Sequence, residues 1–187
     1  MSVPEVMGQQ NEARQPRLFY GRWHAVRARA SELARQIEIT LPKRNLSATA
    51  QLLEDQAPKT CDAVWKLLEK PVESTAIHAI RAGREIYCEI PHLPERIPPE
   101  NLTIYPLAGE ILYFHFPPYM LPSELGKPQG FTEFAIYYGR DSVADCIGVG
   151  PTPSNCFATI VSNLKQLAEA CERIHLEGAE RIVVRRK

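Results

Sequence analysis

Two runs of alternating hydrophobic and polar residues stand close together in the first third of the chain. Residues 37–41 and residues 46–52 both alternate, and a Pro-Lys-Arg-Asn break separates them. Alternation with period two is typical of a strand with one buried face, and two such runs around a short polar turn predict a β-hairpin. We therefore expect the folded part of the chain to begin with two paired strands.

Two later segments carry apolar residues at the spacing of one helix face. Residues 58–68 begin with Pro58, which suits the first turn of a helix because an N–H at that position has no helical partner. Residues 162–174 begin with Ser162, which suits an N-cap, and Gly178 beyond them suits a stop. The two apolar stripes are Cys61, Val64, Trp65 and Leu68, and then Leu164, Leu167, Ala168 and Cys171. We expect two amphipathic helices that pack against a core.

The other apolar segments are short and are separated by turns and prolines. Strands are predicted at residues 75–81, 85–90, 110–116, 133–139, 155–161 and 180–186. Residues 91–106, 117–131 and 140–154 are predicted to be loops, because proline and glycine interrupt regular structure there. This pattern predicts a mainly β protein, a closed antiparallel barrel of about eight strands that is capped by two helices.

The first 34 residues do not continue this pattern. Residues 1–16 are polar and patternless and predict a flexible tail, while the residues from 18 to about 35 predict a basic helix. We divide the chain into an N-terminal extension, residues 1–34, and a barrel domain, residues 35–187. The extension could dock on the body or on a neighbouring subunit, or it could remain solvated. A homo-oligomer is therefore one of the possible states of the protein.

Charge and composition narrow the classes of function. The chain has 22 Lys plus Arg and 22 Asp plus Glu, and this zero balance argues against a dedicated nucleic-acid binder or a polybasic membrane anchor. It contains neither an apolar run of about 18 residues nor a signal-peptide core, so we expect a soluble cytoplasmic protein. The five cysteines are odd in number and include no C-x-x-C pair, which favours buried reduced thiols over disulfides or a metal site.

Two passages resemble parts of cyclophilins. Residues 52–65 resemble a strand that runs into a Pro-Lys-Thr helix start, and residues 155–184 resemble the C-terminal strand, helix and strand. More specifically, the chain resembles an uncharacterised bacterial family with a cyclophilin-like fold. The matching segments are residues 57–62, 76–78, 98–101, 105–106, 109–113, 137–139, Asn155 and 157–160. The resemblance implies a fold and candidate positions over residues 35–187, but no reaction.

The resemblance does not extend to the prolyl isomerase reaction. Cyclophilin isomerases use an Arg just after a Phe-His pair, whereas here Ala79 follows His78 and the nearest Arg is Arg81. On a strand, a shift of two residues keeps the face but moves the side chain by about 6.6 Å. A donor that must reach a twisted amide does not tolerate that displacement, so we expect no ordinary isomerase activity.

The candidate site combines these positions with their chemistry. His78 could act as a general base or could be a satisfied core histidine, and Glu100 could act as an acid–base group in a stiff proline-rich loop. Ligand contacts are predicted at Asn101, Tyr105, Tyr113, Tyr137, Arg140 and Asn155. Some of the tyrosines must be plain packing, because Tyr137 and Tyr138 face opposite ways on a strand. No metal site and no cofactor are predicted.

Three hypotheses follow for the function. The first is binding of a small metabolite, or a reaction on it, at the open face of the barrel. The second is a peptide-binding module or a weak prolyl isomerase, which requires a groove into which Arg81 points. The third is a structural protein whose aromatic loops form a subunit interface.

Overall fold

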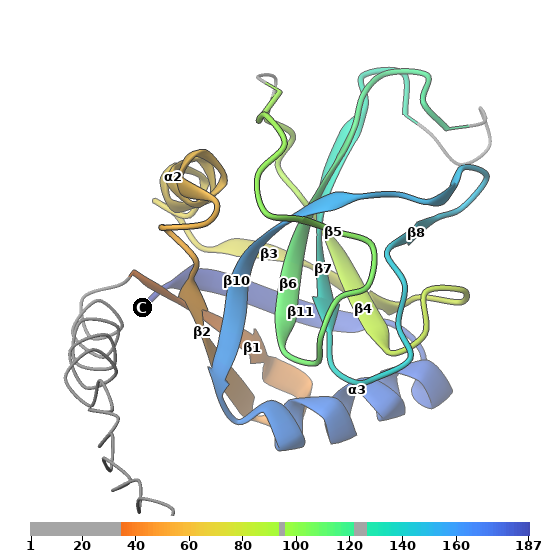
Figure 1. Cartoon of the computed structure of the whole chain (residues 1–187). Coiled ribbons are helices and arrows are strands. Elements are labelled where there is room, and N and C mark those ends of the chain that lie inside the picture. Colours follow the sequence, from red (N-terminus) through yellow and green to blue (C-terminus); the bar gives the residue numbers. More distant parts are fainter. Residues whose placement is uncertain (1–34, 94–95, 122–126) are drawn as a thin grey trace, which may run out of the picture. The chain divides into compact units, whose positions relative to one another are not determined.

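Eight strands form a closed antiparallel barrel (Figure 1). The computed structural model describes residues 35–93, 96–121 and 127–187, so the predicted extension, residues 1–34, lies outside the described residues. The sheet order is β2-β1-β11-β3-β4-β7-β6-β10, and β10 pairs with β2 to close the ring. The barrel strands are β1 Gln36–Leu41, β2 Leu46–Leu52, β3 Val72–His78, β4 Glu85–Ile90, β6 Glu110–Phe116, β7 Phe131–Tyr137, β10 Ser154–Ser162 and β11 Glu180–Arg186. The predicted mainly β barrel with two helices is confirmed.

The predicted hairpin is formed by β1 and β2. Ile39 lies opposite Ala48, and a single 3-10 turn, η1 Pro42–Arg44, joins the strands. Asn45 closes this turn at a φ of +48°, a conformation that asparagine tolerates better than most residues. The alternation predicted the hairpin correctly because one face of each strand lies in the core.

The two helices are α2 Pro58–Leu67 and α3 Leu164–Glu177, which lie on opposite sides of the barrel (Figure 1). Pro58 begins α2 and Gly178 ends α3, as predicted. The predicted N-cap Ser162 is wrong, because Ser162 is still part of β10 and its hydroxyl accepts a hydrogen bond from the backbone of Thr49 at 3.1 Å. Asn163 occupies the N-cap position instead. Within the described residues, no helix has the length and hydropathy needed to cross a membrane.

Several predicted boundaries differ from those observed. The strand predicted at residues 75–81 is shifted toward the N-terminus and ends at His78, so Arg81 lies in the following turn and not on a strand. The strand predicted at 133–139 likewise starts two residues earlier. The predicted loops contain three two-residue strands, β5 Leu102–Thr103, β8 Asp145–Cys146 and β9 Gly150–Pro151. Pairings this short leave no periodic pattern in the sequence.

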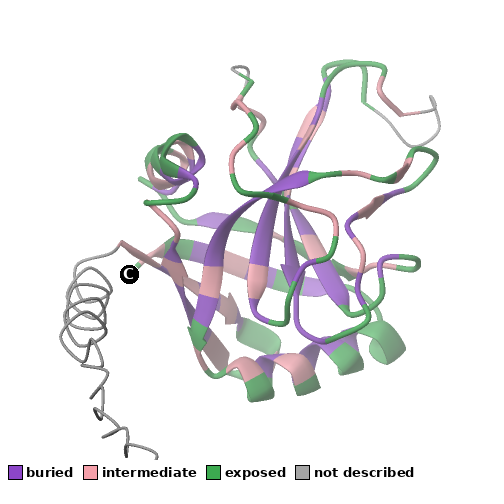
Figure 2. Cartoon of the chain, viewed as in Figure 1, coloured by how far each residue is buried: buried purple, intermediate pink, exposed green. Residues whose placement is uncertain are grey.

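Buried residues occupy both faces of the wall made by β4, β7 and β6 (Figure 2). The inner face belongs to the main core, which includes Ile86, Phe134 and Ile136. The outer face forms a second apolar cluster that contains Leu112, Phe114, Phe116, Ala135, Tyr137, Ala144, Cys146 and Cys156. Segments from the predicted loops pack on it through Met120, Leu121, Ala144 and Cys146. Side chains that alternation alone would place in solvent are therefore enclosed.

Candidate functional site

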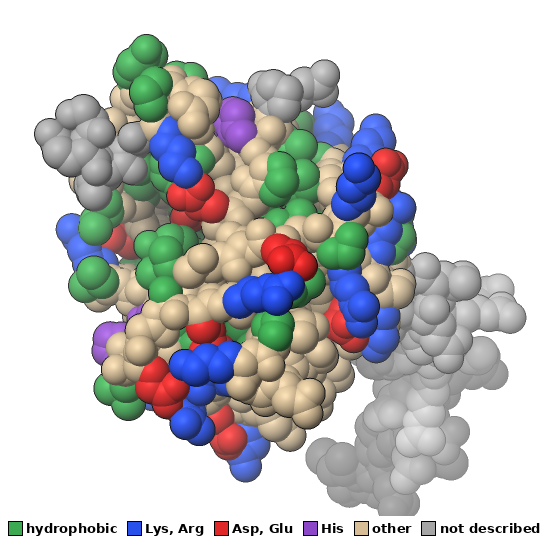
Figure 3. Space-filling view, turned by 180° about the vertical axis from the view of Figure 1, so that it is seen from behind, with side chains coloured by type: hydrophobic (Ala, Val, Ile, Leu, Met, Phe, Trp, Pro, Cys, Tyr) green, Lys and Arg blue, Asp and Glu red, His purple; other side chains and the backbone are tan. Residues whose placement is uncertain are grey.

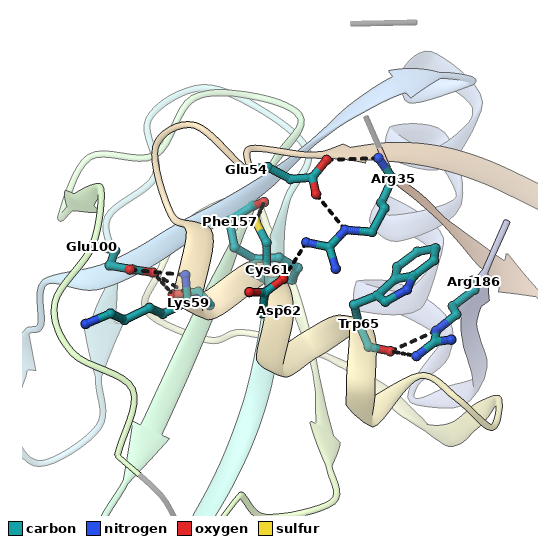
Figure 4. A network of polar contacts seen from close by, with 10 residues as sticks. Arg35, Glu54, Lys59, Cys61, Asp62, Trp65, Glu100, Phe157 and Arg186 are labelled. Carbon is teal, nitrogen blue, oxygen red and sulfur yellow. Dashed lines mark hydrogen bonds and ion pairs between the residues drawn. The ribbon is translucent and has the colours of Figure 1, made fainter. Parts of the chain in front are cut away.

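Glu100 lies at the N-terminus of α2 (Figure 4). Its Oε2 accepts hydrogen bonds from the backbone N–H and the hydroxyl of Thr60, both at 2.8 Å, and its Oε1 accepts one from the backbone N–H of Lys59 at 3.1 Å. The first N–H groups of a helix lack helical partners, and the helix dipole is positive at this end. Glu100 therefore anchors the proline-rich segment to the helix.

The pKa of Glu100 reflects these contacts. Desolvation alone would raise the pKa, but the hydrogen bonds from Thr60 and Lys59 more than offset it, and the pKa lies below the usual value. A group with a lowered pKa stays ionised at neutral pH and contributes stability that is lost only in acid. Glu100 is thus a fixed carboxylate with occupied lone pairs, which is a poor starting point for proton transfer.

Asn155, at the start of β10, holds the same segment. Its Oδ1 accepts a hydrogen bond from the backbone N–H of Glu100 at 3.2 Å. Its Nδ2 donates to the Thr60 hydroxyl and to the carbonyl of Pro98, both at 2.9 Å. Sequence reasoning placed Glu100 and Asn155 in one site, and the structure does bring them together, but their polar atoms are used within the protein.

We expect the substitution Glu100→Gln to lower the free energy of unfolding by about 1 kcal/mol at neutral pH, because the charged cap of α2 is lost. The difference should shrink below about pH 4, where protonation removes the charge of Glu100 as well. Chemical denaturation at several pH values measures both effects. Glu169→Gln, an exposed carboxyl on α3, is the matched control. Equal stability of Glu100→Gln and the parent at neutral pH would contradict the anchoring role.

His78 is a satisfied histidine. Its Nδ1 lies 2.7 Å from the carbonyl of Ala79 and its Nε2 lies 2.6 Å from the Tyr138 hydroxyl. Because a carbonyl only accepts, Nδ1 carries the proton and Nε2 accepts from Tyr138. Desolvation lowers the pKa of His78, and His175, with ring centroids 4.3 Å apart, lowers it further. Both ring nitrogens are occupied, and the catalytic role predicted for His78 stays a prediction.

The other predicted contact residues differ in their exposure and their contacts. Tyr105 is 71% exposed and Arg140 is also exposed. Asn101 donates from Nδ2 to a backbone carbonyl of β10 at 2.8 Å. Tyr113 is buried in the main core and Tyr137 in the outer cluster. Tyr113 does lie directly opposite Asn155 on the neighbouring strand, and the contacts of all the predicted residues with a ligand stay predictions.

A site that sequence reasoning missed lies on the outer face of β4 and β7. We call it the acidic pocket, a cavity of 240 Å³. It is lined by Ala79, Ile80, Arg81, Ala82, Glu85, Tyr87, Glu89, Phe116, Leu121, Phe131, Glu133, Asp145, Cys146 and Ile147. Strand pairing brings the acids together: β4 presents Glu85, Tyr87 and Glu89 on one face, and Glu133 lies directly opposite Glu89 on β7. Aromatic and aliphatic side chains form the remaining walls.

Glu85 is the most unusual group in this pocket. The residue is only 4% exposed, and its Oε2 has no hydrogen-bond partner among the described residues. Burial raises its pKa to about 8; the nearby Asp145 adds to the rise, and the Tyr137 hydroxyl opposes it. Asp145 itself lies 3.3 Å from the guanidinium of Arg81. A buried carboxyl with a free acceptor atom is costly unless something completes its contacts.

Glu133 lines the same pocket but is only half-buried. Burial raises its pKa to about 8, and the charges of Glu85 and Glu89 contribute further. Strongly shifted acids beside a cavity are typical of functional sites. One sequence signal was available, namely a glutamate in the apolar run Phe-Thr-Glu-Phe-Ala-Ile-Tyr, residues 131–137. Alternation alone would place it on the solvent side of the strand, because nothing in the pattern shows that loops cover this face.

A second cavity, of 360 Å³, lies beside the acidic pocket. Phe116 lines both cavities, and Tyr113, His115 and Asn155 line the second one. Burial lowers the pKa of His115, and its Nδ1 has no partner within the described chain. Two of the predicted contact residues thus border a cavity, although not the one that holds the shifted acids.

Neither metal nor thiol chemistry is indicated in the described part of the chain. Residues 35–93, 96–121 and 127–187 contain no group of three or more His, Cys, Asp or Glu side chains arranged to hold a metal ion. All five cysteines are free and buried, as predicted. Burial raises the pKa of each thiol, so none is a thiolate at neutral pH.

The charged surface gives little further direction. On the face seen from behind in Figure 3, acidic and basic side chains lie interspersed and form no large field of one sign. Recognition of a charged group on this face must therefore depend on local geometry.

Comparisons with known proteins place the fold and the family. The chain is similar to a solved structure described as "Structure of McbB in complex with tryptophan", with a TM-score of 0.54 and 19% sequence identity. The match covers 81% of this chain but only 44% of that one, so the present chain spans less than half of its length. No curated protein matches the chain. Residues 39–185 match the family described as "Protein of unknown function (DUF3830)", and the chain therefore belongs to that family.

Proposed function

We propose that this protein binds a small organic molecule in the acidic pocket. The observation that carries the proposal is the free Oε2 of Glu85, an acceptor atom that is buried beside a cavity without a partner among the described residues. Leaving such an atom unsatisfied costs about 1–3 kcal/mol. A ligand that donates a hydrogen bond to Glu85, or that places a positive charge beside it, recovers that cost.

The shape of the pocket suits a small ligand. Binding sites are concave and mostly apolar, with a few convergent polar groups. Phe116, Phe131 and Leu121 provide apolar walls, and the carboxyls provide the polar groups. The volume of 240 Å³ is below the range of about 300–1,000 Å³ that drug-sized ligands require. The ligand is thus of metabolite size.

The likeness to McbB supports the proposal at the level of the fold. The printed description says that McbB was solved in complex with tryptophan, an amino acid of metabolite size. If this protein also catalyses a reaction, the structure favours Glu85 and Glu133 as acid–base groups over His78 and Glu100. Both of the favoured residues line the cavity and have a raised pKa, whereas the other two are held by internal hydrogen bonds.

The second hypothesis, peptide binding with weak isomerase activity, has one observation in its favour. Arg81 lines the acidic pocket, as that hypothesis requires. Its guanidinium, however, pairs with Asp145 at 3.3 Å and is not free to polarise a peptide carbonyl. We therefore rank it below binding of a metabolite.

A thermal-shift screen tests the proposed function. The panel should contain small cations, anions and neutral compounds, each with an apolar body. We expect at least one compound to raise the melting temperature of the parent and of Glu169→Gln. The same compound should raise the melting temperature of Glu85→Gln much less, because the glutamine amide cannot carry the negative charge of an ionised carboxyl. No stabilising compound, or full stabilisation of both Glu85→Gln and Glu133→Gln, would contradict binding in the acidic pocket.

A further inference from the structure

We infer that the ligand of the acidic pocket carries a protonated amine that lies between Glu85 and Glu133, and that binding releases protons to the solvent. This inference rests on the proposed function and names the class of ligand. It follows from the charges that face the pocket, from the spacing of the two acids and from the composition of the walls.

The charges around the pocket leave two acids without a cation. The described residues that line it contribute four carboxylates, Glu85, Glu89, Glu133 and Asp145, and one cation, Arg81, while Lys127 is a second cation that contacts one of these acids. Arg81 already pairs with Asp145, and Lys127 pairs with Glu89. No described cation pairs with Glu85 or Glu133. A ligand that binds here therefore meets an excess of negative charge once these acids ionise.

The remaining titratable groups do not change this balance. Burial raises the pKa values of Tyr87 and Tyr137, and it raises the pKa of Cys146 to about 11. All three side chains are thus neutral around pH 7 to 9. Tyr137 lies directly opposite Glu85, and its buried hydroxyl has no partner within hydrogen-bond geometry among the described residues. The same hydroxyl opposes the rise in the pKa of Glu85, so Tyr137 and Glu85 form one polar cluster behind the wall of the pocket.

The spacing of the acids leaves room for a group between them. Glu85 lies opposite Tyr137 on β7, and Glu133 is four residues away along that strand. Four residues of antiparallel strand correspond to about 13 Å between backbone positions, so the carboxyls do not share a proton directly, but their long side chains can both reach toward a cation between them. Tyr87 stands between the two acids, opposite the small side chain of Ala135. Its ring lines the cavity and can add a cation–π contact.

The walls define the rest of the ligand. Phe116 and Phe131 stack with their ring centroids 4.4 Å apart, and both line the pocket. Leu121 and Ile147 extend this apolar surface. Such walls gain free energy from an apolar or aromatic body, at about 25 cal/mol per Å² of buried apolar surface. The expected ligand is therefore a small amine with an aromatic or aliphatic body.

Proton release follows from the state of the acids without a ligand. Both pKa values are about 8, so at pH 7 each carboxyl is mostly protonated. A nearby ammonium group favours the ionised form and lowers these pKa values, so binding expels protons. Affinity should rise with pH up to about 8, by as much as tenfold per pH unit for each proton released. It should fall again near pH 10, where an aliphatic amine loses its own charge.

Calorimetry with three matched probes tests the inference. Phenethylamine is the cation, 3-phenylpropionate the anion and 2-phenylethanol the neutral compound, and all three carry the same aromatic ring. We expect phenethylamine to bind most tightly, with an affinity about tenfold higher or more at pH 8 than at pH 6.5. The apparent enthalpy of binding should differ between titrations in phosphate and in Tris, and the sign of the difference should show that the buffer takes up protons released on binding.

Variants separate the pocket from other sites. Glu85→Gln and Glu133→Gln should each weaken phenethylamine binding and flatten its pH dependence, whereas Glu169→Gln should do neither. Tighter binding of the anion or the neutral compound, or proton uptake on binding, would overturn the inference while leaving the proposed function intact. If phenethylamine fails to bind while the screen finds an anionic or neutral ligand, the inference fails alone. If no compound binds at all, both fail.

Discussion

Glu85→Gln should stabilise the unliganded protein above pH 8 and change its stability little near pH 5. The parent carboxyl has a pKa raised to about 8 in the folded state, against about 4.5 in the unfolded chain. The folded state thus holds a proton that the unfolded state has lost, so the stability of the parent falls as pH rises from about 4.5 to 8. Glutamine carries no charge at any pH and avoids this loss. At pH 8.5 the free energy of unfolding of the variant should therefore exceed that of the parent by about 2–4 kcal/mol.

Denaturant unfolding at about pH 5, 7 and 8.5 measures this effect. Glu133→Gln should behave in the same way, and Glu169→Gln should follow the parent at every pH. A parent protein whose stability is constant from pH 5 to 8.5 would show that both acids are better solvated than their burial indicates. Glutamine variants that are less stable than the parent at pH 8.5 would lead to the same conclusion.

Asn155→Ala should lower the free energy of unfolding by about 2–4 kcal/mol, the largest loss expected from a single polar side chain here. The residue is 6% exposed and its side chain makes three hydrogen bonds that join β10, α2 and the proline-rich segment. Alanine leaves the carbonyl of Pro98 and the backbone N–H of Glu100 without these partners. Buried groups that lose their partners cost more than the average hydrogen bond contributes.

Ser154→Ala is the matched control for this prediction. Ser154 is the neighbour of Asn155 on β10 and is equally buried, but its hydroxyl makes only a local hydrogen bond to the carbonyl of Thr152 at 3.2 Å. We expect a loss below about 1 kcal/mol for this variant. Equal losses in both variants would show that Asn155 contributes through general packing. Faster amide exchange at Glu100 and Asn101 in Asn155→Ala would support its anchoring role.

Much of the fold could be predicted because its patterns are local. The period-two runs gave β1 and β2, and the apolar stripes gave α2 and α3, since each has one face in the core. The N-cap of α3 could not be predicted, because the bonding of Ser162 depends on Thr49, far away in sequence. The bounds of β3 also differ from the prediction.

The site was harder to predict than the fold. The resemblance brought Glu100 and Asn155 together, but only the structure shows that Thr60 occupies their polar atoms. Glu85 and Glu133 were missed for the opposite reason. They stand where alternation predicts solvent, and their burial depends on separate segments that pack over the outer face of the barrel. A pattern within one strand carries no information about such a cover.

The order of the strands also has a consequence for biosynthesis. β11 lies between β1 and β3, so the second neighbour of each is built from residues 180–186. During translation, β1 and β3 are made early and must wait with one edge unpaired while more than a hundred further residues are added. Exposed edges invite pairing with other chains. Newly made chains of this protein should therefore be open to wrong strand pairing until β11 joins the two strands.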